Sequence, residues 1–403
     1  MSDPVARRSR WSRRLLSAAL LALLTLACAE AGVRVMNRLR LGRWTVNDPE
    51  SAAVNTRMYV PHAWLGHMLR PGAEIISKGR SININSLGYR GPEFPSQKTP
   101  GRVRVVCIGG STTFDVKVTD DAKSWPAQLE RVLREVHDRN DVEVINGGTN
   151  GYAMPRTLID LALRTLDIGP DVVICYPGVN DVAFADHTDH QAGRCHLAIS
   201  APPAQTPAWR DWLSQSELYN EIFSRMLYFR QARYGNWAGE PLPRQDEPEP
   251  TGMAAFERNL TTLAGICQSH GIRLALVTVR AAYRPDQPLE DQERLARSDL
   301  MDHPALSLAG HYRGYGEANA MIREAASRFG AGLIDQSAEL PSRSEDFADS
   351  VHFSDSGAKA FAEFAAAKVV GLLGPAGLTG AVTSAAEPTR TEPPPRQSPE
   401  RSE

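Results

Sequence analysis

Residues 103–113 read Val-Arg-Val-Val-Cys-Ile-Gly-Gly-Ser-Thr-Thr, and they give the clearest indication of the fold class. Its first six residues, apolar apart from Arg104, have the composition of a strand that is buried on both faces. Two glycines then allow a tight turn, and Ser111 stands where a helix can begin. A buried strand that passes through a glycine turn into a helix is typical of parallel sheets in α/β proteins.

The same alternation continues on the carboxyl side of this stretch. Further apolar runs predict four more strands, at residues 142–145, 172–176, 272–279 and 332–334. The segments between them place apolar residues at the spacing of one helix face, as at Leu129, Val132 and Val136. Mostly apolar strands separated by amphipathic helices predict an α/β fold, with a parallel sheet covered on both faces.

Four short polar segments stand out from this pattern. Three directly follow predicted strands: Gly109–Thr113, Asn146–Gly151 and Gly178–Asp181. The fourth, Asp349-Ser-Val-His352, lies in a loop beyond the last predicted strand and leads into a helix that Ser354 can cap. Because ligand sites in open α/β sheets gather at the carboxyl ends of the strands, we expect these segments to form one site.

These segments contain the residue types that acyl transfer requires. A serine hydroxyl such as that of Ser111 becomes a good nucleophile only when a base takes its proton, and histidine titrates in the right range. The three-residue spacing lets Asp349 fold back onto the His352 ring and hold it in one tautomer. The N–H groups of Ser111 and Gly151 and the side-chain amide of Asn180 are candidate donors to a developing oxyanion.

The four segments, in this order, resemble the four sequence blocks of the SGNH/GDSL hydrolase family. The resemblance covers roughly residues 102–373, and residues 85–91 (Asn-Ser-Leu-Gly-Tyr-Arg-Gly) resemble a stretch that often precedes the first block in membrane-anchored members. The family's Gly-Asp-Ser-Leu reads Gly-Gly-Ser-Thr at residues 109–112, which leaves the nucleophile intact. The pattern is not the Gly-x-Ser-x-Gly elbow of α/β-hydrolases, because Thr113 stands at the second glycine position.

The resemblance implies a role for each matching residue. Ser111 would be the nucleophile and first oxyanion donor, Gly151 and Asn180 the other two donors, Asp349 the orienting acid and His352 the base. It also implies a flavodoxin-like three-layer sandwich with five parallel strands. No cofactor and no metal are expected.

The N-terminus predicts a membrane segment. Five arginines precede an apolar run from Leu15 to Ala29, which orients the N-terminus inward and directs the rest of the chain across a membrane. We expect residues 1–33 to be an uncleaved signal anchor, in contact with the membrane through residues 15–33. A cleaved signal peptide, a lipoprotein cut before Cys28 and twin-arginine export remain open. All four place the catalytic domain outside the cytoplasm, in the periplasm or at the cell surface.

The rest of the chain divides by composition. Residues 34–101 are rich in proline and glycine and predict a connecting region of short strands, and residues 102–373 form the predicted catalytic domain. Within it, residues 185–250 lack strand signals and predict an insertion or lid. Residues 374–403 are polar and proline-rich, and we expect them to be disordered.

Several other readings are weaker. The formal charge of −2 offers no basic surface for nucleic acid. Residues 186–190 contain two aspartates and two histidines (Asp186, His187, Asp189 and His190), for which a solvated loop is preferred over a metal site. A Cys195–Cys267 disulfide is left open. Ser350 is expected to matter much less than its neighbours, and Arg90 is expected to be structural.

Three functions follow from these observations. The preferred one is a serine esterase that hydrolyses a carboxylic ester on a cell-envelope or extracellular substrate, whether an acylated small molecule, a lipid or a polysaccharide. The second is an O-acyltransferase that moves acetyl groups to a surface polysaccharide with the same triad. The third is a catalytically idle scaffold of a polysaccharide-export system, against which the intact set of candidate residues argues.

Overall fold

The computed structural model describes residues 4–41, residues 58–184 except 63 and 78, and residues 244–374 except 304 and 342, with residues 213, 216, 218, 219 and 222 between them. Most of the predicted insertion 185–250 and nearly all of the predicted tail 374–403 lie outside the described residues. So do the candidate metal ligands at 186–190 and Cys195.

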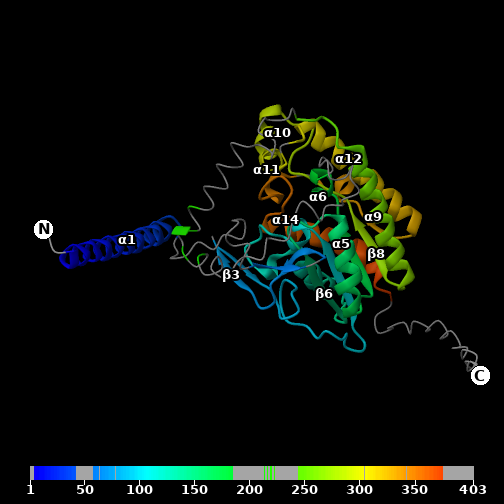
Figure 1. The fold of residues 1–403 in the computed structure, drawn as a ribbon. Coiled ribbons are helices and arrows are strands. Elements are labelled where there is room, and N and C mark those ends of the chain that lie inside the picture. The colour runs from blue at the N-terminus through cyan, green and yellow to red at the C-terminus, as the bar shows by residue number, and fades with distance from the viewer. Residues whose placement is uncertain are drawn as a thin grey trace, which may run out of the picture.

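A five-stranded parallel sheet forms the centre of the domain (Figure 1). In chain order its strands are β5 (Val103–Gly109), β6 (Val142–Gly148), β7 (Val172–Tyr176), β8 (Arg273–Val277) and β9 (Gly332–Ile334). Their spatial order is β6-β5-β7-β8-β9, and every neighbouring pair is parallel. The predicted α/β fold with five parallel strands is therefore confirmed. The strand order reverses beside β5, where ligand sites of such sheets form.

Helices connect the strands. The longer ones are α4 (Trp125–Glu135), α5 (Met154–Asp160), α9 (Pro250–Ser269), α10 (Leu289–Leu295), α12 (Leu308–Phe329) and α14 (Asp355–Val369). The short α-helices are α3 (Ser111–Phe114), α6 (Val179–Phe184), α11 (Arg297–Asp302) and α13 (Gln336–Glu339). Single turns of other helix types are η1 (Asp121–Lys123), η2 (Leu161–Thr165), η3 (Leu166–Ile168), η5 (Ser344–Asp346) and η6 (Val370–Leu372).

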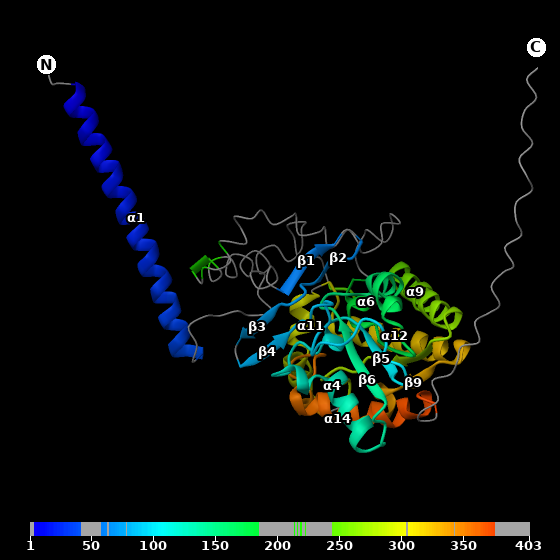
Figure 2. The ribbon, with the colours of Figure 1, turned by 90° about the horizontal axis from the view of Figure 1, so that it is seen from below.

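The two faces of the sheet are covered by different helices. Alternate side chains of a strand point to opposite faces. Val106 and Ile108 of β5 pack in one core with residues of α5, α9 and α12, whereas Val105 and Cys107 pack in a second core with residues of α4 and α14. Figures 1 and 2 show these helices on either side of the sheet. The three-layer arrangement implied by the family resemblance is thus present.

Two antiparallel hairpins precede the sheet. They pair β1 (Tyr59–His62) with β2 (Gly66–Leu69), and β3 (Glu74–Ser77) with β4 (Arg80–Asn83). Their apolar side chains form a third core that also includes Phe114 and Val116, at and just after the end of α3. The hairpins are therefore packed directly against the segment that carries Ser111.

Helix α1 (Pro4–Leu41) contains the apolar N-terminal run. Its stretch Leu16–Met36, 21 residues long, is apolar and long enough to cross a membrane, a property that signal sequences share. The stretch is not buried against the domain, and Figures 1 and 2 show the helix projecting away from it. Glu30 lies within this stretch and forms an ion pair with Arg34 at 2.7 Å.

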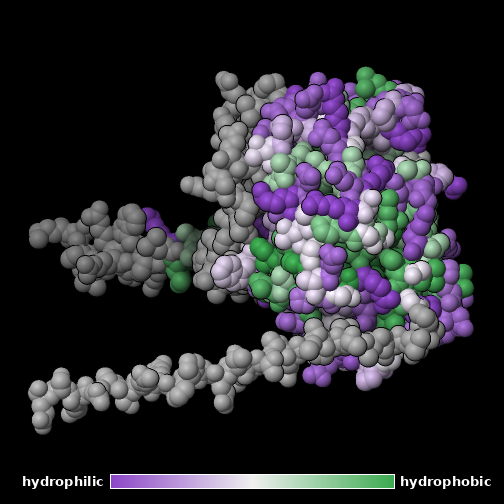
Figure 3. Space-filling model, turned by 90° about the vertical axis from the view of Figure 1, so that its right-hand side faces the viewer, coloured by the Kyte–Doolittle hydropathy of each residue, from purple (hydrophilic) through white to green (hydrophobic). Residues whose placement is uncertain are grey.

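Among the described residues the cysteines are free thiols. Cys107, Cys175 and Cys267 are buried in the two cores of the sheet, and Cys28 is exposed on α1. Cys267 carries a free thiol, whereas Cys195, its partner in the disulfide that the sequence left open, lies outside the described residues. Hydrophilic and hydrophobic residues are interspersed on the face of the domain shown in Figure 3.

Candidate active site

The turn after β5 carries Ser111 and is built from glycine. Gly109 has φ +146°, and a Cβ at this position would lie 2.5 Å from Thr113 Oγ1. A Cβ on Gly148, at the end of β6, would lie 2.1 Å from the backbone nitrogen of Phe114. A larger residue at either position would displace α3, whose first residue is Ser111.

The side chains of Ser111, His352 and Asp349 form a hydrogen-bonded row. His352 Nε2 lies 2.7 Å from Ser111 Oγ, and His352 Nδ1 lies 2.9 Å from both carboxylate oxygens of Asp349. Asp349 Oδ1 also accepts the backbone N–H groups of Val351 at 3.1 Å and His352 at 2.9 Å. An ionised carboxylate only accepts, so Nδ1 carries the hydrogen and Nε2 is left to accept from the serine hydroxyl. This is the arrangement that base-assisted attack requires.

A lysine contacts the acid of this row. Lys117 Nζ lies 3.2 Å from Asp349 Oδ2. Burial would raise the pKa of Asp349, but the His352 ring and the Lys117 ammonium outweigh it and hold that pKa well below its usual range. Burial lowers the pKa of His352 and the Asp349 charge raises it, with a net rise, while Lys117 acts in the lowering direction. The lysine therefore moderates the basicity of the imidazole.

The loop between Asp349 and His352 is fixed through Ser350, which is fully buried. The Ser350 hydroxyl donates to Leu295 O at 2.9 Å, accepts from Asp299 N at 3.1 Å and lies 2.5 Å from Ser298 Oγ. Its backbone N–H donates to the same Ser298 oxygen at 3.0 Å. Ser350 thus holds the loop to α10 and to the first turn of α11. This burial gives no support to the expectation that the residue matters little.

Tyr152 connects Gly151, its neighbour in the chain, with Asn180, which binds its carbonyl oxygen. Residues 149–152 form a turn, here called the Gly151 turn, in which Tyr152 N donates to Thr149 O at 3.2 Å and Gly151 has φ +75°. Asn180 Nδ2 donates to Tyr152 O at 2.9 Å, and a Cβ on Gly110 would lie 2.8 Å from the same nitrogen. A small cavity is lined by Gly110, Tyr152 and Asn180.

The N–H groups expected to serve as oxyanion donors are uncommitted. No acceptor in the described part of the chain takes the backbone N–H of Ser111 or that of Gly151. Asn180 uses one side-chain hydrogen for Tyr152 and retains a second one. Asp181 fixes the neighbourhood, because its buried carboxylate accepts Met154 N at 2.8 Å and Gly178 N at 3.2 Å. Burial raises the pKa of this carboxyl to about 6.

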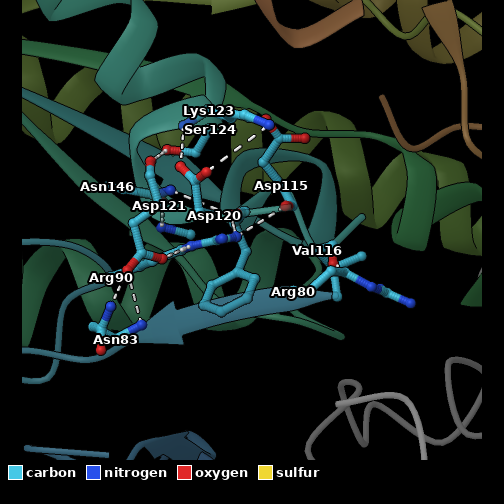
Figure 4. A network of polar contacts seen from close by, with 12 residues as sticks. Arg80, Asn83, Arg90, Asp115, Val116, Asp120, Asp121, Lys123, Ser124 and Asn146 are labelled. Atoms are coloured by element: carbon cyan, nitrogen blue, oxygen red, sulfur yellow. Dashed lines mark hydrogen bonds and ion pairs between the residues drawn. The ribbon is translucent and has the colours of Figure 1, made fainter. Parts of the chain in front are cut away.

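Arg90 stabilises the other end of α3 (Figure 4). Its fully buried guanidinium donates from Nη1 to the carbonyl oxygens of Phe114 at 2.7 Å and Asp115 at 2.8 Å. Nε forms an ion pair with Asp121 at 2.7 Å, and the guanidinium carbon lies 4.7 Å from the centre of the Phe114 ring. Asn83 holds the second carboxylate oxygen of Asp121. The contacts agree with the structural role expected for Arg90: it stabilises the C-terminus of the helix that begins with Ser111.

The structure brings all five candidate residues to the carboxyl ends of β5, β6 and β7 and to the loop before α14. It adds three supporting residues to which the sequence assigned no such role: Lys117, Ser350 and Asp181. Ser350 and Asp181 lie inside the polar segments 349–352 and 178–181, whereas Lys117 had no local signal. Among the described residues, no group of three or more His, Cys, Asp or Glu side chains is arranged to hold a metal ion.

Comparison with known proteins gives a family. The sequence model of the GDSL-like lipase/acylhydrolase family matches residues 107–360, well over half of the chain. None of the curated proteins compared with the chain matches it significantly.

Solved structures of similar fold share little sequence with this chain. The acetyl xylan esterase AlAXEase is 17% identical, with 67% of this chain and 98% of that chain covered and a TM-score of 0.37. The hydrolase LAE5 from the metagenome of Lake Arreo, Spain, is 15% identical, with coverages of 68% and 97% and a TM-score of 0.39. A lipase/acylhydrolase from Enterococcus faecalis is 17% identical, with coverages of 67% and 96% and a TM-score of 0.38. Likeness at this level says nothing of the substrate of this chain.

Proposed function

The chain belongs to the GDSL-like lipase/acylhydrolase family and is a hydrolase acting on ester bonds, and on this premise we propose that it cleaves a carboxylic ester with Ser111, His352 and Asp349 as its triad. The observation that carries the proposal is the continuous row of hydrogen bonds from Ser111 Oγ through both ring nitrogens of His352 to Asp349. The substrate would be an acylated small molecule, lipid or polysaccharide of the cell envelope or the extracellular space.

Acylation follows from the geometry of the row. Ser111 Oγ attacks the ester carbonyl while His352 Nε2 takes its proton, and Asp349 stabilises the imidazolium that forms. The tetrahedral intermediate collapses when the C–O bond to the alcohol breaks, and His352 returns the proton to the departing oxygen. Water then attacks the acyl-serine with His352 again as base, and the carboxylic acid leaves.

The negative oxygen of each intermediate needs fixed donors. We assign this role to the N–H groups of Ser111 and Gly151 and to the side-chain amide of Asn180. The three donors follow the carboxyl ends of β5, β6 and β7, and their uncommitted hydrogens support the assignment, because no existing hydrogen bond has to break when the charge develops. Loss of one such donor typically costs about 3–4 kcal/mol of activation free energy.

Two alternative functions, O-acyl transfer and a catalytically idle scaffold, have less support from the contacts in the structure. O-acyl transfer to a surface polysaccharide would pass through the same acyl-serine, but no contact among the described residues favours a sugar hydroxyl over water as the acceptor. An idle scaffold would have no use for an aligned acid, base and hydroxyl. Hydrolysis is therefore the function that we favour.

Covalent labelling tests the proposal directly. A fluorophosphonate should modify full-length protein at Ser111, and p-nitrophenyl esters of graded acyl length should be hydrolysed, since only an activated serine reacts quickly. Ser111→Ala should abolish both. A peptide map with the adduct on another residue, or steady turnover by Ser111→Ala, would remove Ser111 as the nucleophile.

We also propose that α1 anchors the protein in a membrane with the catalytic domain outside the cytoplasm. The support is the apolar stretch Leu16–Met36 and the arginines that precede it. Fractionation should recover full-length protein with the membranes, and protease added outside the membrane should digest the domain. Full-length protein in the cytoplasmic fraction would contradict the proposal.

A further inference from the structure

The β1–β2 hairpin, which precedes the segment matched by the family, lies against the Gly151 turn. His67 of β2 contacts the backbone of this turn through Nε2, which lies 3.0 Å from the carbonyl oxygen of Asn150. In return, the Tyr152 hydroxyl donates to the carbonyl oxygen of His67 at 2.7 Å. The His67 ring also packs edge-on against the rings of Tyr59 and Tyr152, with centroid distances of 4.8 and 5.5 Å. Hairpin and turn are thus joined by two reciprocal hydrogen bonds.

The first of these bonds has only one possible direction. A carbonyl oxygen accepts and never donates, so Nε2 of His67 carries the hydrogen and the ring is the donor. Burial lowers the pKa of His67 to about 4, and the ring is therefore neutral near pH 7. The Nε2 hydrogen is present in the protonated ring as well, so protonation of His67 does not remove this donor.

The peptide group that receives this bond is the one that supplies a proposed oxyanion donor. The C=O of Asn150 and the N–H of Gly151 belong to the same planar amide, so a bond to one end sets the direction of the other. A hydrogen bond to the carbonyl also polarises the amide and strengthens its N–H as a donor. Gly151 itself has no side chain that could fix the plane, and glycine adopts a φ of +75° about as readily as a negative φ, so its own backbone preference does not hold the peptide in one orientation.

We propose that His67 is a positioning residue that orients and polarises the Asn150–Gly151 peptide so that the Gly151 N–H points at the oxyanion. The inference rests on the proposed function, because it needs Gly151 to be an oxyanion donor. It gives the hairpin, which lies outside the matched residues 107–360, a part in catalysis. The donor acts most strongly on the tetrahedral intermediate, so its loss should reduce kcat and leave KM nearly unchanged.

Three variants of the full-length protein test this role. His67→Phe keeps the ring contacts and removes the donor, and we expect about a tenfold loss of kcat, a part of the 10²–10³-fold loss on removing a whole donor. His67→Gln retains an N–H donor at a similar reach and should recover kcat to within about threefold of the wild type. The control is His62→Phe in the same hairpin. His62 Nδ1 accepts from Trp64 N and Leu65 N, and this ring has no bond to the Gly151 turn.

The measurements separate positioning from simple loss of structure. kcat and KM are determined for a p-nitrophenyl ester, the rate of fluorophosphonate labelling is followed in parallel, and a thermal melt gives the folded fraction of each variant. Labelling should slow with kcat, because the phosphonyl oxygen occupies the same donors as the oxyanion. Wild-type kcat in His67→Phe would overturn the proposal, and so would a His67→Gln variant as slow as His67→Phe or an equal loss in His62→Phe.

Failure of the proposed function would look different. Wild-type protein that neither labels at Ser111 nor hydrolyses any ester would remove the triad itself, before any hairpin variant is considered. Normal labelling and turnover in the wild type, with no effect at His67, would remove only the role of the hairpin.

Discussion

Replacing Arg90 by methionine should slow turnover, whereas the same replacement at Arg104 should not. Both guanidinium groups are fully buried, and each forms one ion pair: Arg90 with Asp121 at 2.7 Å and Arg104 with Glu143 at 2.9 Å. Each also donates to backbone carbonyl oxygens and lies over a phenylalanine ring. The two arginines differ in position: Arg90 holds the C-terminus of α3, whereas Arg104 lies near the start of β5.

The two changes should cost similar stability but unequal activity. Removing one partner of a buried ion pair leaves the other group uncompensated and costs about 3–5 kcal/mol of unfolding free energy. At Arg90 the carbonyl oxygens of Phe114 and Asp115 also lose their shorter bonds and keep only those from Asn146 Nδ2 at 3.3 Å and Val118 N at 3.4 Å. The four-residue helix that begins with Ser111 is then held less firmly and can shift. A displacement of about 1 Å at a reacting group can cost about 10²-fold in rate.

The assay compares the variants per folded molecule. Thermal melts give the folded fraction, fluorophosphonate titration gives the number of active serines, and p-nitrophenyl acetate gives kcat. We expect Arg90→Met to lose about 10²-fold in kcat, and Arg104→Met to stay within about twofold of the wild type. Equal kcat per folded molecule in the two variants would refute the idea that Arg90 positions Ser111.

Three further predictions concern the donors, the base and its loop. Asn180→Ala should lower kcat by about 10²–10³-fold with little change in KM, and a raised KM at nearly full kcat would mean that this amide binds ground-state substrate. Lys117→Met removes a positive charge that lowers the pKa of His352, so this pKa should rise further. The acid limb of the kcat/KM profile, where the base becomes protonated and inactive, should then move to higher pH, and an unmoved limb would show that the lysine does not act on the base. Ser350→Ala leaves the Asp299 N–H and the Leu295 carbonyl oxygen without a partner, which costs about 1–3 kcal/mol of unfolding free energy each, so both the melting temperature and kcat should fall. The control is Thr278→Val, which also removes one donated and one accepted bond of a buried hydroxyl. It should lower the melting temperature and leave kcat unchanged.

The strands and the five candidate residues could be predicted because their signals are local. Residues 103–108 and 172–176 are apolar on both faces, which only a sheet covered on both sides makes favourable. Glycine at 109 follows the first of these runs directly and asparagine at 180 follows the second within four residues, so topology alone brings them to one edge. The Asp-x-x-His spacing likewise fixes a contact within four residues of chain.

The supporting contacts could not be predicted because they join distant segments. Ser350 meets Ser298 across 52 positions, and His67 meets the turn at Asn150 across 83. The spacing of apolar residues along the chain does not show which loop a hairpin will pack against, because that contact depends on how whole helices and strands dock. The prolines and glycines of residues 34–101 predicted short strands, yet not that the core of these strands would be completed by Phe114, in the same short helix as Ser111.

The buried thiols have a consequence for the environment in which the domain can work. Thiol–disulfide exchange proceeds through the thiolate, which must reach a sulfur atom in another molecule. Burial raises the pKa of Cys267 to about 12 and those of Cys107 and Cys175 well above the ordinary value, so none of these groups supplies that species at neutral pH. These three buried thiols therefore keep the same covalent state under reducing and oxidising conditions, and the two cores that contain them need no disulfide for their packing.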